Sequence, residues 1–184
     1  TGEMWGSTRY GIEPDMITFA KGVSSGYVPL GGVLVGERVR RPFWDDPVPG
    51  AILRHGYTYS GHAGAAAAAL ANLDIIEREG LVARVKTLEP YVAASFTRLN
   101  GRPLVGEIRT VGMTAAVTVD PDALATDPGN PERLVAAAYR NGVATRVLRG
   151  HALQFSPPLV ITEAQIDAII DAFGAAFDEV AAAR

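Results

Sequence analysis

The chain has 184 residues, enough for one domain or parts of two, and its 48% hydrophobic and 20% charged content is ordinary for a globular protein. A net charge of −3 argues against a nucleic-acid or membrane-surface partner, and the absence of cysteine excludes disulfides and thiolate metal sites. No apolar run approaches the roughly 18 residues that a bilayer span needs.

The first residues, Thr1 to Trp5, contain no initiator methionine and no signal-peptide pattern. We therefore expect a fragment, or the ordered part of a longer chain. Further on, the short apolar run Met16–Ala20 predicts a buried strand of the kind found in parallel sheets, and Gly22–Gly26 predicts a loop after it.

Lys21 stands where this strand ends, a position at which functional groups gather in open α/β sheets. A lysine there is either a covalent nucleophile that forms a Schiff base or an ordinary loop lysine with a solvated amine, and the residues alone leave both open. The chain has only two lysines, Lys21 and Lys86, against 15 arginines, so few amines are available for covalent chemistry.

A second apolar strand is predicted at Gly31–Gly36, followed by a brief helix at Arg38–Arg41 that stops at Pro42. Asp45–Gly50, with two prolines and a glycine, is typical of a turn.

The stretch H-G-Y-T-Y-S-G-H at residues 55–62 places four hydroxyl groups between two glycines, directly before an alanine-rich helix predicted from Ala63 to Arg78. Hydroxyls and free backbone N–H groups at a helix N-terminus can bind phosphate. Alternatively, Ser60 or Thr58 merely caps the helix.

The remaining elements are predicted from periodicity and capping signals. They comprise a helical segment at 81–99 with a kink or junction at Pro90 and Lys86 on its solvated face, strands at 104–109 and 113–119, a surface loop at 120–129, a helix from Asn130-Pro131 to about 141, strands at 143–147 and 152–155, and a last helix that begins at Thr162 with a capping box to Gln165.

Two regions follow from these elements: residues 1–78, with a glycine-rich, parallel-sheet character, and residues 79–184, a compact α+β domain. No metal site is predicted, because the three histidines have no further ligand at suitable spacing.

Three longer stretches are more specific. They read T-G-E-M-W-G with G-I-E-P-D-M-I-T-F-A-K-G-V-S-S-G-Y-V-P-L-G-G within residues 1–32, H-G-Y-T-Y-S-G-H, and T-R-V-L-R-G-H-A-L-Q-F-S-P-P-L-V-I-T at residues 145–162. With them the chain resembles the C-terminal half of class III (ω-amino acid:pyruvate-type) aminotransferases, which depend on pyridoxal 5'-phosphate (PLP). The Y-S-G-H sequence favours the ω-transaminase branch.

The resemblance implies an α/β chain of PLP fold type I: the C-terminal part of the large mixed-sheet domain in residues 1–78, and the small C-terminal α+β domain in residues 79–184. It implies that Lys21 is the catalytic Schiff-base lysine. Thr58 matches a threonine that hydrogen-bonds the PLP phosphate of the partner subunit, and Tyr57 lies beside it. Arg146 matches an arginine that pairs with a substrate carboxylate; an ion pair within the small domain is the alternative.

The same resemblance implies a transaminase that transfers an amino group from an ω-amino acid or amine to pyruvate or another 2-oxo acid. It also implies a cytoplasmic homodimer or a tetramer of paired dimers. The family's aspartate for the pyridine nitrogen, its glycine-rich loop and its ring-stacking aromatic lie upstream of such a segment, so we expect the chain alone to be inactive. The alternatives are a 4-aminobutyrate or diamine aminotransferase, an aminomutase, or an inactive fragment that serves only assembly.

Overall fold

The computed structural model describes residues 1–183 and divides into two compact units. One consists of Trp5–Leu81; the other combines Thr1–Met4 with the chain from Val82 onward. Because the first four residues lie with the C-terminal part of the chain, the predicted division into 1–78 and 79–184 remains a proposal for the domains of the complete protein.

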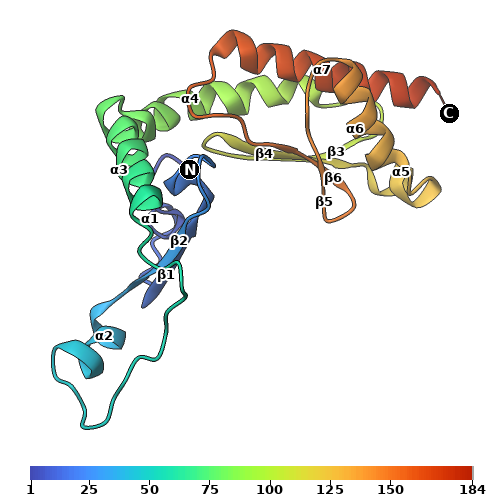
Figure 1. Cartoon of the computed structure of the whole chain (residues 1–184). Helices are drawn as coiled ribbons and strands as arrows, with labels where there is room; N and C mark the ends of the chain where they lie inside the picture. The colour runs from blue at the N-terminus through green and yellow to red at the C-terminus, as the bar shows by residue number, and fades with distance from the viewer. Residues whose placement is uncertain (184) are drawn as a thin grey trace. The chain divides into compact units, whose positions relative to one another are not determined.

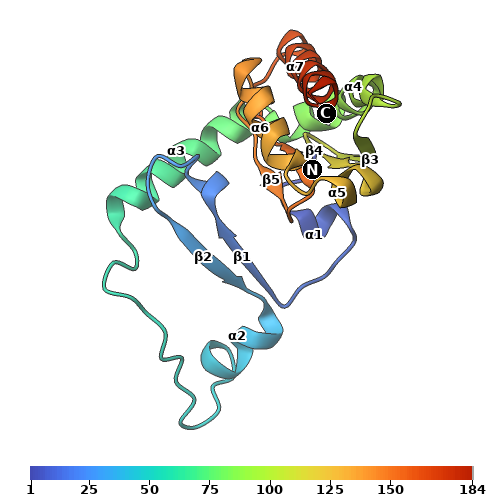
Figure 2. The ribbon, with the colours of Figure 1, turned by 90° about the vertical axis from the view of Figure 1, so that its right-hand side faces the viewer.

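The unit Trp5–Leu81 is built around a pair of antiparallel strands (Figure 2). Met16 lies opposite Val35 and Ala20 opposite Gly31. Its elements in order are α1 (Gly6–Arg9), β1 (Met16–Ala20), the 3-10 turn η1 (Lys21–Val23), β2 (Gly31–Val35), α2 (Glu37–Trp44) and α3 (Ala63–Arg78). Figure 2 shows the long segment between α2 and α3, which contains no helix or strand.

The prediction of a buried strand in a parallel sheet is wrong for this chain. β1 pairs only with β2 among the described residues, in antiparallel direction, and its residues are exposed or half-buried. Met16 and Val33 are each about half exposed. An apolar run indicates that a strand can be buried on both faces. Residues 1–183 do not supply the second layer that would cover this strand.

The helix α2 runs through Pro42 to Trp44, so the predicted stop at that proline is also wrong. The helix spans only two turns, and its C-terminal end is held by hydrogen bonds from the N–H groups of Asp45 and Asp46 to the carbonyl of Arg41. A proline in a short, solvent-exposed helix removes one backbone hydrogen bond without disturbing any packing.

The second unit contains an antiparallel sheet of four strands in the order β3-β4-β6-β5. Helices α4, α6 and α7 pack on this sheet (Figure 1). The elements are α4 (Leu81–Phe96), η2 (Thr97–Leu99), β3 (Val105–Val111), β4 (Thr114–Val119), α5 (Pro121–Thr126), α6 (Asn130–Arg140), β5 (Val147–Leu148), β6 (Ala152–Phe155) and α7 (Glu163–Ala182).

The core of this unit lies between the sheet and these helices. Phe96, Phe173, Phe177, Leu134 and Leu153 are almost completely buried, and the rings of Phe96 and Phe155 meet edge to face with centroids 5.1 Å apart. The unit therefore has the continuous apolar core that the pair β1–β2 lacks.

The sequence signals in this unit did not all predict the structure correctly. The capping box at Thr162 and Gln165 is present and begins α7, as predicted. Pro90 lies inside a single continuous helix instead of dividing two. The predicted loop at 120–129 contains α5, because the Asp120 carboxylate accepts hydrogen bonds from the N–H groups of Asp122 and Ala123 and caps that helix.

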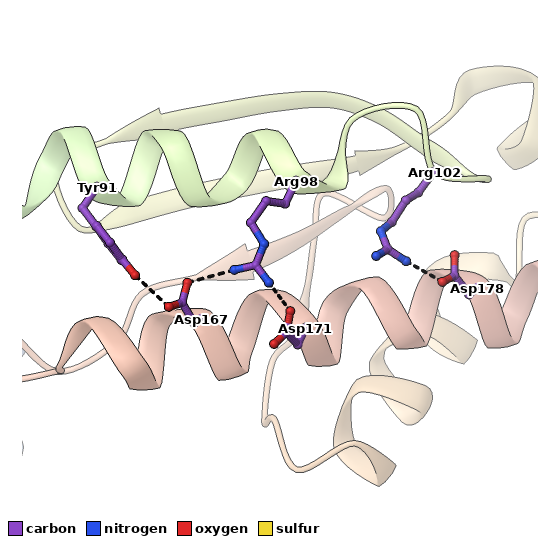
Figure 3. A network of polar contacts seen from close by, with 6 residues as sticks. All are labelled: Tyr91, Arg98, Arg102, Asp167, Asp171 and Asp178. Atoms are coloured by element: carbon purple, nitrogen blue, oxygen red, sulfur yellow. Dashed lines mark hydrogen bonds and ion pairs between the residues drawn. The ribbon is translucent and has the colours of Figure 1, made fainter.

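A row of polar contacts joins α4 and the turn after it to α7 (Figure 3). The Tyr91 hydroxyl donates to Asp167 at 2.7 Å, and Arg98 binds both Asp167 and Asp171. The hydrogen bond to Asp167 raises the pKa of Tyr91 above its usual value of 10.0. Such exposed pairs add little stability individually, but in a row they fix the register of two packed helices.

Within residues 1–183, we find no helix whose length and apolar character would allow it to cross a membrane.

Candidate active site

Lys21 follows the last residue of β1 and opens the turn η1. Its φ angle is +50°, in the left-handed region that non-glycine residues rarely adopt, and its side chain is exposed. No ion pair or hydrogen bond engages its amine among the described residues. The structure thus presents a free amine at a strained position where a strand ends, and such strain is concentrated at functional sites.

The loop that follows is held by a side chain from far along the sequence. Asn72, in the third turn of α3, donates from Nδ2 to the carbonyl oxygens of Gly22 (2.8 Å) and Val23 (3.1 Å). Its Oδ1 accepts a hydrogen bond from the Ser25 hydroxyl at 2.6 Å. Ser24 is buried and donates to the carbonyl of Val28 at 2.7 Å.

The other lysine is differently placed. Lys86 lies on α4, and its Nζ forms an ion pair with Glu3 at 2.5 Å, both residues belonging to the second unit. Its side chain is about half exposed, in agreement with the predicted solvated face. The Lys86 amine is therefore already engaged by a carboxylate, whereas the Lys21 amine has no such partner among the described residues. Lys21 is thus the better candidate of the two.

The stretch 55–62 forms an exposed turn before α3. Ser60 does not cap α3: its Oγ accepts from the N–H of Tyr57 at 2.9 Å. The cap is His62, whose Nδ1 accepts from the N–H of Ala65 at 3.1 Å. The alternative that Ser60 or Thr58 caps the helix is therefore not realised, and the Thr58 hydroxyl has no partner among residues 1–183.

Arg146 lies just before β5, in the second unit. Its Nε donates to Oε1 of Gln154 at 2.5 Å, and Nε2 of Gln154 donates to the Ser156 hydroxyl at 2.8 Å. No carboxylate pairs with Arg146 in the described chain, so the alternative of an ion pair within the small domain is not realised. The two terminal NH₂ groups of its guanidinium remain available to a ligand.

The predicted residues thus fall in two places. Lys21, Tyr57 and Thr58 belong to the unit Trp5–Leu81, and Arg146 belongs to the other. Within residues 1–183, no hydrogen bond or ion pair links Lys21 to Tyr57 or Thr58. Tyr57 is exposed and its ring meets that of His55 edge to face.

Sequence reasoning missed Asn72 and Gln154, which hold Lys21's loop and Arg146 respectively. For Asn72 a signal existed: it is the only uncharged polar residue in α3, a helix otherwise made of glycine, apolar and charged residues. Asparagine is a poor helix former, so its place in the middle of such a helix calls for a compensating contact. Gln154 gave no comparable signal.

Comparison with known proteins decides the family. The sequence profile of the family described as "Aminotransferase class-III" matches residues 1–177. The chain belongs to the class III aminotransferases.

Among class III relatives, the diaminobutyrate–2-oxoglutarate transaminase of Halomonas elongata is 41% identical over 177 residues, covering 92% of this chain and 38% of that protein. The putrescine–pyruvate aminotransferase of Pseudomonas aeruginosa is 39% identical, covering all of this chain and 40% of that protein. A crystal structure of an (S)-enantioselective ω-transaminase from Thermomicrobium roseum superposes with a TM-score of 0.87 at 37% identity, over 98% of this chain and 40% of that one.

The chain therefore spans about two fifths of the length of these class III relatives. These likenesses confirm the α/β fold as PLP fold type I. Membership of the class III aminotransferases implies pyridoxal phosphate as the cofactor. The residues present fit that group, because Lys21 offers an unpaired amine for its aldehyde and Thr58 an unpaired hydroxyl for its phosphate.

Proposed function

We propose that this chain is the C-terminal part of a transaminase that transfers an amino group from an ω-amino acid or amine to pyruvate or another 2-oxo acid. The observation that carries the proposal is the free amine of Lys21 at the end of β1, in a chain matched to the class III family over residues 1–177. When bound, PLP supplies an aldehyde for imine chemistry and a ring that accepts negative charge.

In this proposal Lys21 has two tasks. Its amine would hold the cofactor through the cofactor's aldehyde. When a donor amine has taken its place, the freed Lys21 amine would accept the proton from the donor carbon and pass it on. Overall, the donor would lose its amino group and become an aldehyde or ketone, and the 2-oxo acid would receive that group and become an amino acid; the water consumed in the first half of the reaction would be released in the second.

Arg146 would bind the carboxylate of the donor or of the 2-oxo acid. Gln154 engages Nε of its guanidinium, which leaves the two NH₂ groups directed away from that bond for two parallel hydrogen bonds to one carboxylate. The planar fork suits this task better than a lysine amine.

The test of the cofactor assignment is borohydride reduction of the PLP-loaded protein followed by peptide mapping. We use the longest polypeptide that the gene encodes, with Lys86→Ala as the matched lysine control. A pyridoxyl group on the peptide containing Lys21, absent in Lys21→Ala and retained in Lys86→Ala, is expected. Labelling at Lys86 alone, or at neither lysine, would refute the proposal.

The proposed homodimer with shared sites rests on Thr58, whose hydroxyl would bind the phosphate of the partner subunit's cofactor. A subunit carrying Lys21→Ala and one carrying Thr58→Val are each defective. If Thr58 acts across the dimer, a mixed dimer contains one site with both wild-type residues and recovers activity. If Thr58 acts within its own subunit, every site in the mixed dimer keeps one defect and no activity returns.

A diamine donor is the second candidate, because two relatives at 39–41% identity are named for putrescine and diaminobutyrate. Measuring ω-amino acids, monoamines and diamines against both pyruvate and 2-oxoglutarate separates these functions. An aminomutase would interconvert the amino acid without consuming a 2-oxo acid, and a protein serving only assembly would accept no donor even with Lys21 labelled.

We also propose that the 184 residues alone have no transaminase activity. The pair β1–β2, which carries Lys21, is a two-stranded sheet whose residues are exposed or half-buried, and such a pair is marginally stable without further strands or a covering layer. The cytoplasmic location expected above remains part of this proposal.

A further inference from the structure

Asn72 lies outside every stretch that resembles the family's motifs quoted above, yet its side chain forms three hydrogen bonds to the Lys21 loop. We propose that Asn72 is a positioning residue for Lys21: its carboxamide holds the backbone after the lysine in the strained conformation that presents the amine. This inference rests on the proposed function of Lys21.

The three hydrogen bonds of the Asn72 side chain all go to the Lys21 loop. The Nδ2 group donates to the carbonyls of Gly22 and Val23, which belong to the two residues directly after Lys21. Since carbonyl oxygens only accept, the orientation of the carboxamide is fixed, and its Oδ1 faces the hydroxyl of Ser25. Every polar atom of the side chain is thus committed to this loop.

These bonds hold a stretch of backbone that contains two strained residues. Lys21 and Ser25 have φ angles of +50° and +49°, and both are non-glycine residues. A left-handed conformation at such residues persists only when surrounding contacts enforce it. Two of the bonds from Asn72 go to Gly22 and Val23, which lie between the two strained positions, and the third goes to Ser25 itself, so they are placed to enforce both.

The side chain that holds the loop comes from a long helix. Asn72 is carried by α3, a helix of 16 residues, whereas the loop has only the single turn η1. A side chain on a long helix moves less than a loop, and a site held by such an element keeps its geometry better than one held by a loop alone. A merely solvent-facing asparagine would contact none of these groups.

The test uses Asn72→Ala, which removes all three bonds, and Asn72→Asp, which retains an acceptor for Ser25 but sets a carboxylate against two carbonyls. Ser25→Ala removes one bond only. Asn141→Asp is the matched control, because Asn141 also donates from Nδ2 to a backbone carbonyl, that of Ala137 at 2.9 Å, in the other unit.

The first readout needs no cofactor. Amide hydrogen exchange in the peptide spanning residues 21–27 is expected to rise about tenfold or more in Asn72→Ala and Asn72→Asp, and less in Ser25→Ala. Exchange in β3 and β4 is expected to match the wild type in the Asn72 and Ser25 variants, and exchange in the peptide 21–27 is expected to match the wild type in Asn141→Asp. Unchanged exchange in the loop of both Asn72 variants would overturn the proposal.

The second readout separates positioning from mere stability. With excess PLP, we measure the single-turnover rate of the donor half-reaction per cofactor-loaded subunit, and the pH profile of the loaded protein's absorbance. Positioning predicts a fall of about tenfold or more per loaded subunit in both Asn72 variants, with a displaced pH midpoint. Loaded subunits that react at the wild-type rate would overturn it. If wild-type Lys21 is never labelled by borohydride, the proposed function fails, and the exchange experiment still decides whether Asn72 holds the loop.

Discussion

Replacing Arg146 by leucine is expected to weaken the use of carboxylate-bearing substrates while sparing substrates that have no carboxylate. In the structure, Nε of Arg146 is engaged by Gln154 at 2.5 Å, and the two terminal NH₂ groups have no partner among residues 1–183. A carboxylate can therefore accept two parallel hydrogen bonds from them. Leucine retains much of the apolar stem and removes both donors.

The size of the effect follows from those two bonds. A hydrogen bond to a charged group contributes about 1.5–3 kcal/mol, so two contribute about 3–6 kcal/mol when water is excluded. Arg146 is exposed, and solvent screening lowers this by about half, to roughly 1.5–3 kcal/mol. At about 1.4 kcal/mol for each factor of ten, the expected loss in kcat/KM is about 10- to 140-fold. Arg146→Lys, which keeps the charge but not the fork, should lose about tenfold.

The assay is the donor half-reaction of the PLP-loaded enzyme, followed in a single turnover without any 2-oxo acid. Omitting the 2-oxo acid isolates the effect of the substitution on the donor, because the 2-oxo acid also carries a carboxylate. The donors are 3-aminopropanoate and propylamine. They have the same number of carbon atoms, but only 3-aminopropanoate carries a carboxylate. Arg149→Leu is the matched control, since Arg149 lies three positions along the chain and has no side-chain partner among the described residues.

Equal losses for the two donors in Arg146→Leu would refute the reasoning, because a carboxylate ligand cannot affect a substrate that has no carboxylate. A similar selective loss in Arg149→Leu would move the assignment to that residue. Unchanged kinetics with both donors would leave Arg146 without a role in binding.

Three further predictions follow. Gln154→Leu should weaken carboxylate-bearing donors about fivefold and spare propylamine, because one hydrogen bond that orients Arg146 is lost; equal effects on both donors would contradict this. Tyr91 has a raised pKa because it donates to Asp167, so the fold stabilises its neutral form, and that stabilisation is lost as the pH rises from about 10 through the raised value. Denaturant titrations of Tyr91→Phe should therefore show a shallower fall in unfolding free energy above about pH 10 than the wild type. Thr162→Ala should lower the unfolding free energy by about 1 kcal/mol, measured in the same way, since it removes the capping box of α7; an unchanged midpoint would mean that the cap contributes nothing.

The parts of the fold that depend on neighbouring residues were predictable from the sequence. The run Met16–Ala20 gives β1 with the same bounds, and the spacing of Thr162 and Gln165 gives the start of α7. Each signal lies within a few residues of the structure that it specifies, so no knowledge of distant contacts is needed.

The parts that depend on distant contacts were not predictable. The direction of pairing of β1 and its exposure depend on what lies beside it, which its own residues do not encode. Asn72 contacts a loop about 50 positions earlier in the chain, and only its low helix propensity marks it. The alternative of a cap on α3 named only hydroxyl groups, whereas the acceptor is a ring nitrogen of His62.

The N-terminal residues Thr1–Met4 have a consequence for how the chain responds to cleavage. They lie in the unit that begins again at Val82: Glu3 is paired with Lys86, and Gly112 lies so near Thr1 that a Cβ there would be 2.8 Å from the Thr1 Cα. The chain therefore leaves this unit after Met4, forms the other unit with Trp5–Leu81, and returns at Val82. A protease that nicks the exposed segment at 46–61 would release no fragment under native conditions, since each piece keeps a segment, Thr1–Met4 or the chain from Val82 onward, in the same unit. The nicked chain should migrate as one molecule until denaturant separates it into two.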